Sequence, residues 1–142
     1  MSAARLYPRF ARARLREALA DSPVVLIHGP RQCGKTTLAR AVGEPAGYSY
    51  IGFDDGPARE AAEADPVGFV ASLPARVILD EVQHVPRLFD AIKTAVDRDR
   101  KPSRFLLTGS ANVLLVPALS DSLAGRSGPG KLNDAISGNS GY

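Results

Sequence analysis

Short apolar runs recur along the chain, each followed by a segment of mixed character. Four of them have the length and the β-branched or aromatic content of buried strands. They lie at residues 24–28, 48–53, 76–80 and 104–108. None alternates strictly between apolar and polar residues over its whole length, which is typical of strands covered on both faces.

The segments between these runs have helical periodicity. Helices are predicted over residues 9–20 and 36–42, and over a run that opens at Pro86 and repeats Leu88, Ile92 and Val96. An acidic, alanine-rich segment broken at Asp65-Pro66 predicts two short helices. Strands alternating with helices indicate an α/β fold with a mostly parallel sheet, right-handed crossovers and a ligand at the carboxyl ends of the strands.

The composition fits a single domain. The chain has 142 residues, of which 44% are hydrophobic and 23% charged, as in an ordinary globular protein. We expect a basic amphipathic helix in residues 1–20 and a core in residues 21–126. Residues 127–142 are rich in Gly, Ser and Asn and are expected to form a disordered tail.

The cellular location is predicted from the lack of a membrane span and of a secretory signal in the sequence. No apolar run reaches the length of about 18 residues that a membrane span needs, and no secretory signal pattern opens the chain. A cytoplasmic location without membrane contact is therefore expected. The single cysteine, Cys33, excludes an intramolecular disulfide and agrees with a reducing compartment.

Positive charge is concentrated near the N-terminus. The net charge is +3 and the pI about 9.3, and five arginines lie in the first 16 residues: Arg5, Arg9, Arg12, Arg14 and Arg16. Two interpretations stay open, a solvated helix face and a nucleic-acid patch. The first is favoured, because Leu15 and Leu19 recur at helical spacing and the arginines largely fall between the apolar positions.

The chemistry centres on a phosphate-binding loop between the first strand and its helix. Residues 29–36 fit the pattern GxxxxGK followed by Ser or Thr. In such a loop backbone N–H groups and the helix N-terminus bind phosphate, Lys35 reaches the β- and γ-phosphates, and the Thr36 hydroxyl binds magnesium. The predicted nucleotide-binding residues are Gly29, Pro30, Arg31, Gln32, Cys33, Gly34, Lys35, Thr36 and Thr37. Cys33 is either a small loop residue or an oxidation switch.

Two adjacent carboxylates end the third strand. Alone, Asp80 and Glu81 would be an ordinary surface strand end, but one strand and helical crossover after a phosphate loop they predict a hydrolytic site. Asp80 is expected to hold magnesium, and Glu81 to act as the base for the attacking water.

The fourth strand brings hydroxyls and an amide to the same edge of the sheet. Ser110 is the first candidate for a residue that senses the γ-phosphate or the water, with Thr108 and Asn112 as alternatives. A turn followed by a helix cap explains the same residues equally well.

These residues together resemble the AAA-like prokaryotic ATPase domain family of P-loop NTPases. The resemblance covers most of residues 5–126. Its motifs are Arg9, the loop at residues 29–38, Phe53-Asp54-Asp55, Asp65-Pro66, the Leu-Asp-Glu-Val-Gln run at residues 79–83, Val96-Asp97, residues 107–110 and residues 122–126. The family implies ATP and Mg²⁺ as ligands, ATP hydrolysis, and a sheet in which the Asp80 strand is not adjacent to the loop strand. ATP over GTP rests on this resemblance.

The sequence departs from the family pattern in three places. His28 and Cys33 replace residues more usual there, and after Arg126 the expected apolar strand gives way to Ser-Gly-Pro-Gly. We therefore expect a C-terminally truncated member that lacks the final strand and the lid, so that residues 24–27 form an exposed sheet edge. Arg126 is predicted either as an arginine finger across a homo-oligomer interface or as a helix-end cation.

Several functions remain open at this point. Mg-dependent ATP hydrolysis leads, and a nucleotide-binding switch or fragment without appreciable turnover is the alternative. A kinase is disfavoured because no arginine-rich lid follows Ser110, and remodelling of DNA or protein is permitted without direct support. The sequence identifies no protein partner.

Overall fold

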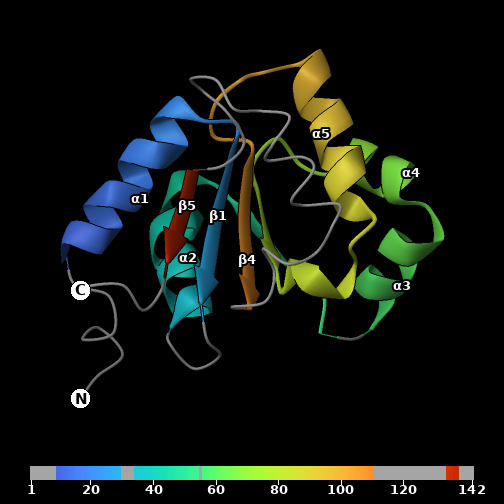
Figure 1. Cartoon of the computed structure of the whole chain (residues 1–142), viewed down its shortest axis with the longest axis horizontal. Helices are drawn as coiled ribbons and strands as arrows, with labels where there is room; N and C mark the ends of the chain where they lie inside the picture. The colour runs from blue at the N-terminus through green and yellow to red at the C-terminus, as the bar shows by residue number, and fades with distance from the viewer. Residues whose placement is uncertain (1–8, 30–33, 55, 111–133, 138–142) are drawn as a thin grey trace.

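The computed structural model describes residues 9–29, 34–54, 56–110 and 134–137. Five strands and five α-helices are formed there, with two short 3-10 helices between them (Figure 1). The strands are β1 (Val24–Gly29), β2 (Ser49–Gly52), β3 (Val77–Asp80), β4 (Phe105–Ser110) and β5 (Asp134–Ser137). The helices are α1 (Arg9–Asp21), α2 (Lys35–Gly43), α3 (Pro57–Ala64), α4 (Pro66–Ala71) and α5 (Leu88–Arg98), with η2 (Glu44–Ala46) and η3 (Val82–His84).

The strands form one sheet in the order β2-β3-β4-β1-β5, and every neighbouring pair is parallel. The predicted α/β class and parallel sheet are confirmed. Strand β4 lies between β1 and β3, so the Asp80 strand is not adjacent to the loop strand, as the family resemblance implies. All strands point the same way, which brings the ends of β1, β3 and β4 to one edge.

The outer edge of β1 differs from the prediction. Residues 24–27 were expected to be exposed for want of a final strand, but β5 pairs with β1 there, with Leu26 opposite Ala135. The expectation that all of residues 127–142 form a disordered tail is likewise wrong for 134–137. The physical reason is that an unpaired strand edge leaves backbone N–H and C=O groups to be satisfied, and four residues of backbone suffice to pair with β1.

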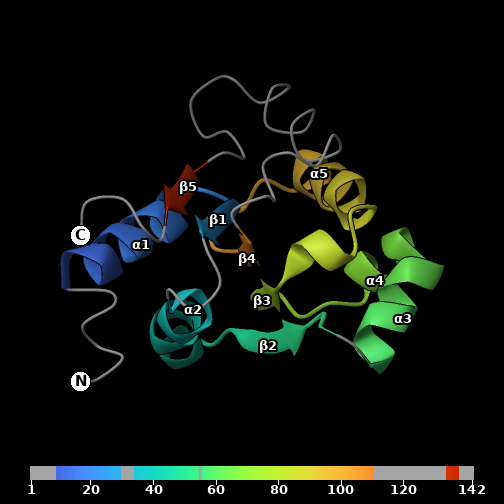
Figure 2. The same ribbon diagram turned by 60° about the horizontal axis from the view of Figure 1, so that its bottom comes forward.

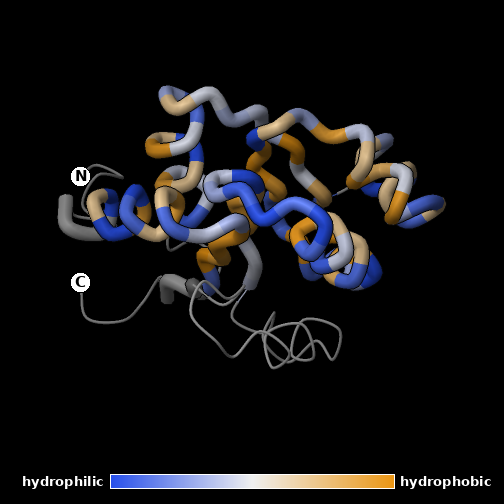
Figure 3. Tube along the Cα trace, turned by 90° about the horizontal axis from the view of Figure 1, so that it is seen from above, coloured by the Kyte–Doolittle hydropathy of each residue, from blue (hydrophilic) through white to orange (hydrophobic). Residues whose placement is uncertain are grey.

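Two hydrophobic layers enclose the sheet. Successive residues of a strand point to opposite faces, so Val25 and Ile27 pack with α1 and α2 while Val24 and Leu26 pack toward α4 and α5. Figure 2 shows α1 and α2 on one side of the strands and α3, α4 and α5 on the other. Figure 3 shows hydrophobic residues along the interior segments and hydrophilic residues mainly on the outer helices.

The helices follow the predicted periodicity closely. Leu88, Ile92 and Val96 are at most 1% exposed and form the buried face of α5, as predicted. The helix begins at Leu88 rather than Pro86, because the N–H of Leu88 bonds back to Val85 and forms a turn first. Asp65 separates the two short helices, and its carboxylate caps α4 by accepting the N–H of Gly68 at 3.1 Å.

The N-terminal helix packs through its leucines. Leu15 is 0% and Leu19 5% exposed, whereas Arg14 and Arg16 lie at the surface. This arrangement agrees with the interpretation of α1 as an amphipathic helix with a solvated basic face. None of the helices in the described part of the chain combines the length and apolar character needed to cross a bilayer.

Candidate functional site

The phosphate loop connects the end of β1 with the start of α2. Gly29 is the last residue of β1, and Lys35, Thr36 and Thr37 open α2. Gly34 precedes the helix with φ 84° and ψ 18°, a left-handed conformation that favours glycine. The predicted loop residues Pro30, Arg31, Gln32 and Cys33 lie outside the described residues.

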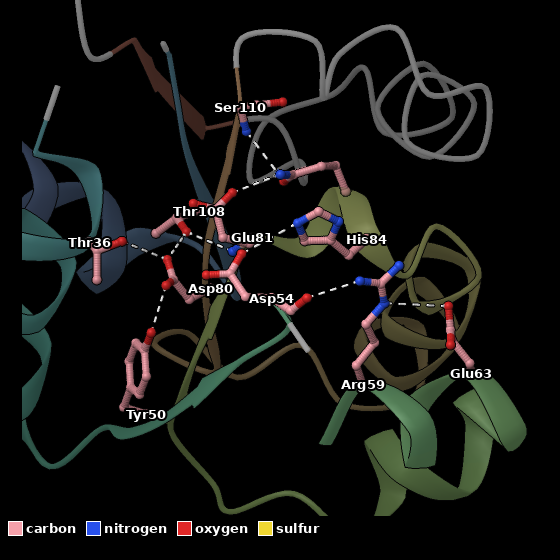
Figure 4. Close-up of polar contacts among 11 residues, drawn as sticks. Thr36, Tyr50, Asp54, Arg59, Glu63, Asp80, Glu81, His84, Thr108 and Ser110 are labelled. Carbon is pink, nitrogen blue, oxygen red and sulfur yellow. Dashed lines mark hydrogen bonds and ion pairs between the residues drawn. The ribbon is translucent and has the colours of Figure 1, made fainter. Parts of the chain in front are cut away.

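Asp80, at the end of β3, is the centre of the polar contacts. It is 5% exposed, and its Oδ1 accepts hydrogen bonds from the hydroxyls of Thr36, at 2.8 Å, and Thr108. Its Oδ2 accepts the Tyr50 hydroxyl at 2.6 Å. Figure 4 shows these three side chains pointing at the carboxylate from α2, β4 and β2. A buried carboxylate is costly unless hydrogen-bonded, and here both of its oxygens are.

The hydrogen bond between Thr36 and Asp80 joins the two predicted halves of the site. These residues are 44 positions apart in the sequence. Lys35 is 4% exposed, directly before Thr36. The pKa of His28, near the end of β1, is lowered mainly by burial and secondly by the positive charge of Lys35. His28 is therefore favoured in its neutral form.

Glu81 follows in an unusual backbone conformation. Its φ of 62° and ψ of 49° are left-handed, which is rare for a residue other than glycine and concentrates at functional sites. Its N–H donates to the Thr108 hydroxyl at 3.0 Å, and its Oε1 accepts the Gln83 side-chain amide at 2.7 Å. Thr108 therefore contacts both acidic residues.

Asp54 and His84 lie on the other side of Glu81. The ligand atoms of Asp54, Glu81 and His84 all lie within 4.8 Å of one another, and His84 Nε2 is 3.5 Å from Asp54 Oδ1. The backbone carbonyl of Asp54 accepts Arg59 Nη1 at 2.9 Å, which links this side of the site to α3 (Figure 4).

Comparison with known proteins agrees with this geometry. A model of the AAA domain family matches residues 21–133, across the loop, β3 and β4. The chain belongs to the AAA domain family. Membership of this family indicates the general class of nucleotide-binding, ATPase-type domains.

Two mycobacterial proteins are similar to this AAA domain chain. They are uncharacterized protein Mb2031c of Mycobacterium bovis and uncharacterized protein Rv2008c of Mycobacterium tuberculosis. Each is 47% identical over 119 residues, which make up 83% of this chain and 26% of the relative. The chain thus spans about a quarter of the length of the curated relatives it matches.

The family implies magnesium, and the donors of this AAA domain fit it. Mg²⁺ prefers oxygen ligands from one or two protein groups, with the rest from water and phosphate. The Thr36 hydroxyl, at the start of α2, and the Asp80 carboxylate, at the end of β3, supply two such oxygens. The same helix N-terminus favours the negative charge of phosphate.

The residues predicted at and after the end of β4 have different outcomes. Ser110 ends β4 and enters the network through its backbone N–H, which donates to Gln83 Oε1 at 3.3 Å. Thr108, predicted as an alternative to Ser110, contacts Asp80 directly. Asn112 and Arg126 lie outside the described residues.

Tyr50 and Gln83 were not singled out as site residues from the sequence. Tyr50 reaches Asp80 because Gly52, two residues along β2 and opposite Asp80, has no side chain: a Cβ there would lie 3.0 Å from the Tyr50 hydroxyl. The sequence alone carries no signal for this contact, because it depends on β2 lying beside β3. Gln83 was visible only as the last member of the motif at residues 79–83.

Proposed function

We propose that this AAA domain chain binds ATP with Mg²⁺ and hydrolyses the bond between the β- and γ-phosphates to give ADP and inorganic phosphate. The observation that carries this proposal is the 2.8 Å hydrogen bond between Thr36 and Asp80, which unites the phosphate loop and the acidic strand end. A structural strand end has no need of a buried carboxylate facing the helix that follows a phosphate loop.

Binding is assigned to the start of α2. The N-terminus of that helix faces the phosphates, and Lys35 neutralises their charge. Thr36 and Asp80 would hold the Mg²⁺ ion. When bound, the ion neutralises charge that develops on the phosphate oxygens during transfer.

Hydrolysis is assigned to Glu81. Its carboxylate accepts a proton from the attacking water as the water oxygen forms a bond to the γ-phosphorus, and the bond to the bridging oxygen breaks with its electrons leaving on ADP. The left-handed backbone turns the residue after Asp80 away from the strand direction. We further propose Ser110 as the γ-phosphate sensor, and Arg126 as a finger that acts across a homo-oligomer interface.

A nucleotide-binding switch without turnover is the second candidate. The observation behind it is the hydrogen bond from Gln83 to one oxygen of Glu81. In this candidate the bond withholds that oxygen from water, and in the hydrolytic candidate it leaves the other oxygen free to act as the base. Under this alternative ATP binding alone would change the surface that a partner recognises.

Phosphate release separates the two candidates. We expect the parent chain to hydrolyse ATP, and Glu81→Gln to lower turnover by roughly 10²–10⁴-fold, the usual contribution of a general base, while the dissociation constant for Mg-ATP stays within about threefold. Lys35→Ala is the control that loses binding. A parent that binds Mg-ATP without releasing phosphate would favour the switch, and a Glu81→Gln variant as fast as the parent would exclude Glu81 as the base.

A further inference from the structure

The side-chain amide of Gln83 joins the acidic end of β3 to the end of β4. Its Nε2 donates to Glu81 Oε1 at 2.7 Å, and its Oε1 accepts the backbone N–H of Ser110 at 3.3 Å. Gln83 lies in η3, the single turn that follows Glu81, and is half-buried. One amide group therefore bridges two strand ends whose residues are 27 positions apart.

The chemistry of the two partners fixes which way this amide faces. A backbone N–H can only donate, so the amide oxygen must face Ser110. The NH₂ group is then left for Glu81, and an ionised carboxylate accepts it without the need for a proton. The two contacts support each other, because rotating the amide by half a turn would break both.

Other contacts hold Glu81 in the same place. Its N–H donates to the Thr108 hydroxyl, and its backbone is in the left-handed region, which persists in a residue other than glycine only where the surroundings enforce it. Thr108 and Ser110 both belong to β4, so β4 holds Glu81 at its backbone directly and at its carboxylate through Gln83.

Strand β4 also pairs with β1, the strand that leads into the phosphate loop. Ser110 lies opposite Gly29, the last residue of β1 before the loop. A shift of the β4 end relative to β1 would therefore change the position of the Ser110 N–H and, through Gln83, the position of the Glu81 carboxylate.

We propose that Gln83 is a positioning residue, which fixes the Glu81 carboxylate where it can activate the attacking water. Through Ser110 it also links this carboxylate to the end of β4, beside the strand that leads into the phosphate loop. This inference rests on the proposed function. Gln83 does not touch the reacting atoms; it acts through Glu81. Its removal should leave nucleotide binding intact, because its amide bonds to Glu81 and Ser110, whereas binding is assigned to Lys35, Thr36 and Asp80.

Steady-state kinetics test the positioning role. Gln83→Met keeps the length of the side chain and removes both hydrogen bonds, and we expect it to lower kcat by about 10–100-fold, the usual effect of displacing a reacting group by about 1 Å. KM and the dissociation constant for Mg-ATP should stay within about twofold of the parent. Ser72→Ala, which removes an exposed hydrogen bond at the end of α4, is the matched control and should behave as the parent.

A double variant separates positioning from a general loss of structure. In the Glu81→Gln background the Gln83→Met change should lower turnover little further, because both act on one step. The proposal is overturned if Gln83→Met turns over within twofold of the parent, if its defect lies in KM, or if the two losses multiply.

Amide hydrogen exchange tests the link without turnover. Exchange at the Ser110 N–H, followed by NMR, should accelerate roughly five- to tenfold in Gln83→Met, as expected for one lost hydrogen bond. Gln83→Glu keeps an acceptor for Ser110 but sets a carboxylate against Glu81, so Ser110 should stay protected while kcat falls. Should the parent bind Mg-ATP without hydrolysis, the proposed function fails and exchange alone decides: faster exchange in Gln83→Met supports the link, and unchanged exchange overturns it.

Discussion

Asp80 is the residue around which the site is organised. Three hydroxyls, from a helix and two strands, bind its two oxygens, and each of these bonds joins elements that are distant in the sequence. Burial is the main cause that raises the pKa of Tyr50, followed by its hydrogen bond to Asp80 and the negative charge of that carboxylate. Tyr50 is therefore protonated, and a hydrogen-bond donor, at neutral pH.

Removing the Tyr50 hydroxyl should measurably destabilise the chain. Hydrogen bonds to charged groups contribute about 1.5–3 kcal/mol, so Tyr50→Phe is expected to lower the free energy of unfolding by that order. The Arg40 guanidinium, 4.3 Å from the centre of the Tyr50 ring, can stack on phenylalanine as well, so this contact is retained. Urea denaturation of parent and variant measures the difference.

Tyr48→Phe is the matched control for that prediction. The Tyr48 hydroxyl is buried, which raises its pKa, and the Ser103 side chain lies near enough to oppose that rise in pKa without forming a hydrogen bond of good geometry. Its loss should therefore cost less than the loss of a bond to a carboxylate. Equal destabilisation by the two substitutions would show that the bond to Asp80 contributes no more than an average hydroxyl.

The sequence predicted the residues of the site whose role follows from spacing. Lys35 and Thr36 belong to one loop pattern, and Asp80 ends an apolar strand, so both positions were visible without coordinates. Tyr50 was not, because its contact depends on β2 lying beside β3 and on the space above Gly52. The contact of Gln83 with Ser110 likewise depends on β3 and β4 being neighbours.

At the scale of elements, β1 is the strand on which the site depends most. It is paired on both sides, by β4 and by β5, and delivers Gly29 to the phosphate loop. The other four strands, β1 to β4, were predictable from their apolar runs. Strand β5 was not, because it has only four residues within a segment rich in Gly, Ser and Asn, and its backbone pairing with β1 leaves no pattern in the sequence.

The pairing of β5 yields a prediction about association. Removing residues 134–142 would uncover the edge of β1, whose residues Val25 and Ile27 are 0% exposed. An unpaired apolar strand is a template for intermolecular pairing, so this variant should self-associate with increasing concentration. Size-exclusion chromatography with light scattering gives the measurement.

Removal of residues 138–142 alone is the control, because it leaves β5 in place. This shorter deletion should behave as the parent. If both deletions gave the same mass at every concentration, β5 would not be the element that protects β1.

At the scale of the whole molecule, the order of the strands creates the site. Insertion of β4 between β1 and β3 separates the phosphate loop from Asp80 by one strand, and α2 then closes the distance so that Thr36 meets Asp80. Ligands of parallel α/β sheets bind at the carboxyl ends of the strands, where this contact lies. The family resemblance predicted that the Asp80 strand is not adjacent to the loop strand, and the periodicity of the sequence alone did not.

The central claim is that this end of the sheet binds Mg-ATP. The most direct test is the melting temperature of the purified chain in the presence of ATP. It is measured for the parent and for Lys35→Ala, once with Mg²⁺ and once with EDTA. A ligand at about 100 times its dissociation constant stabilises the native state by about 2.7 kcal/mol, which corresponds to roughly 10 °C for a chain of this size. We predict a shift of that order in the parent with Mg-ATP, a smaller one in EDTA, and none in Lys35→Ala. A parent whose melting temperature ignores Mg-ATP, or a Lys35→Ala variant that responds equally, would contradict the account.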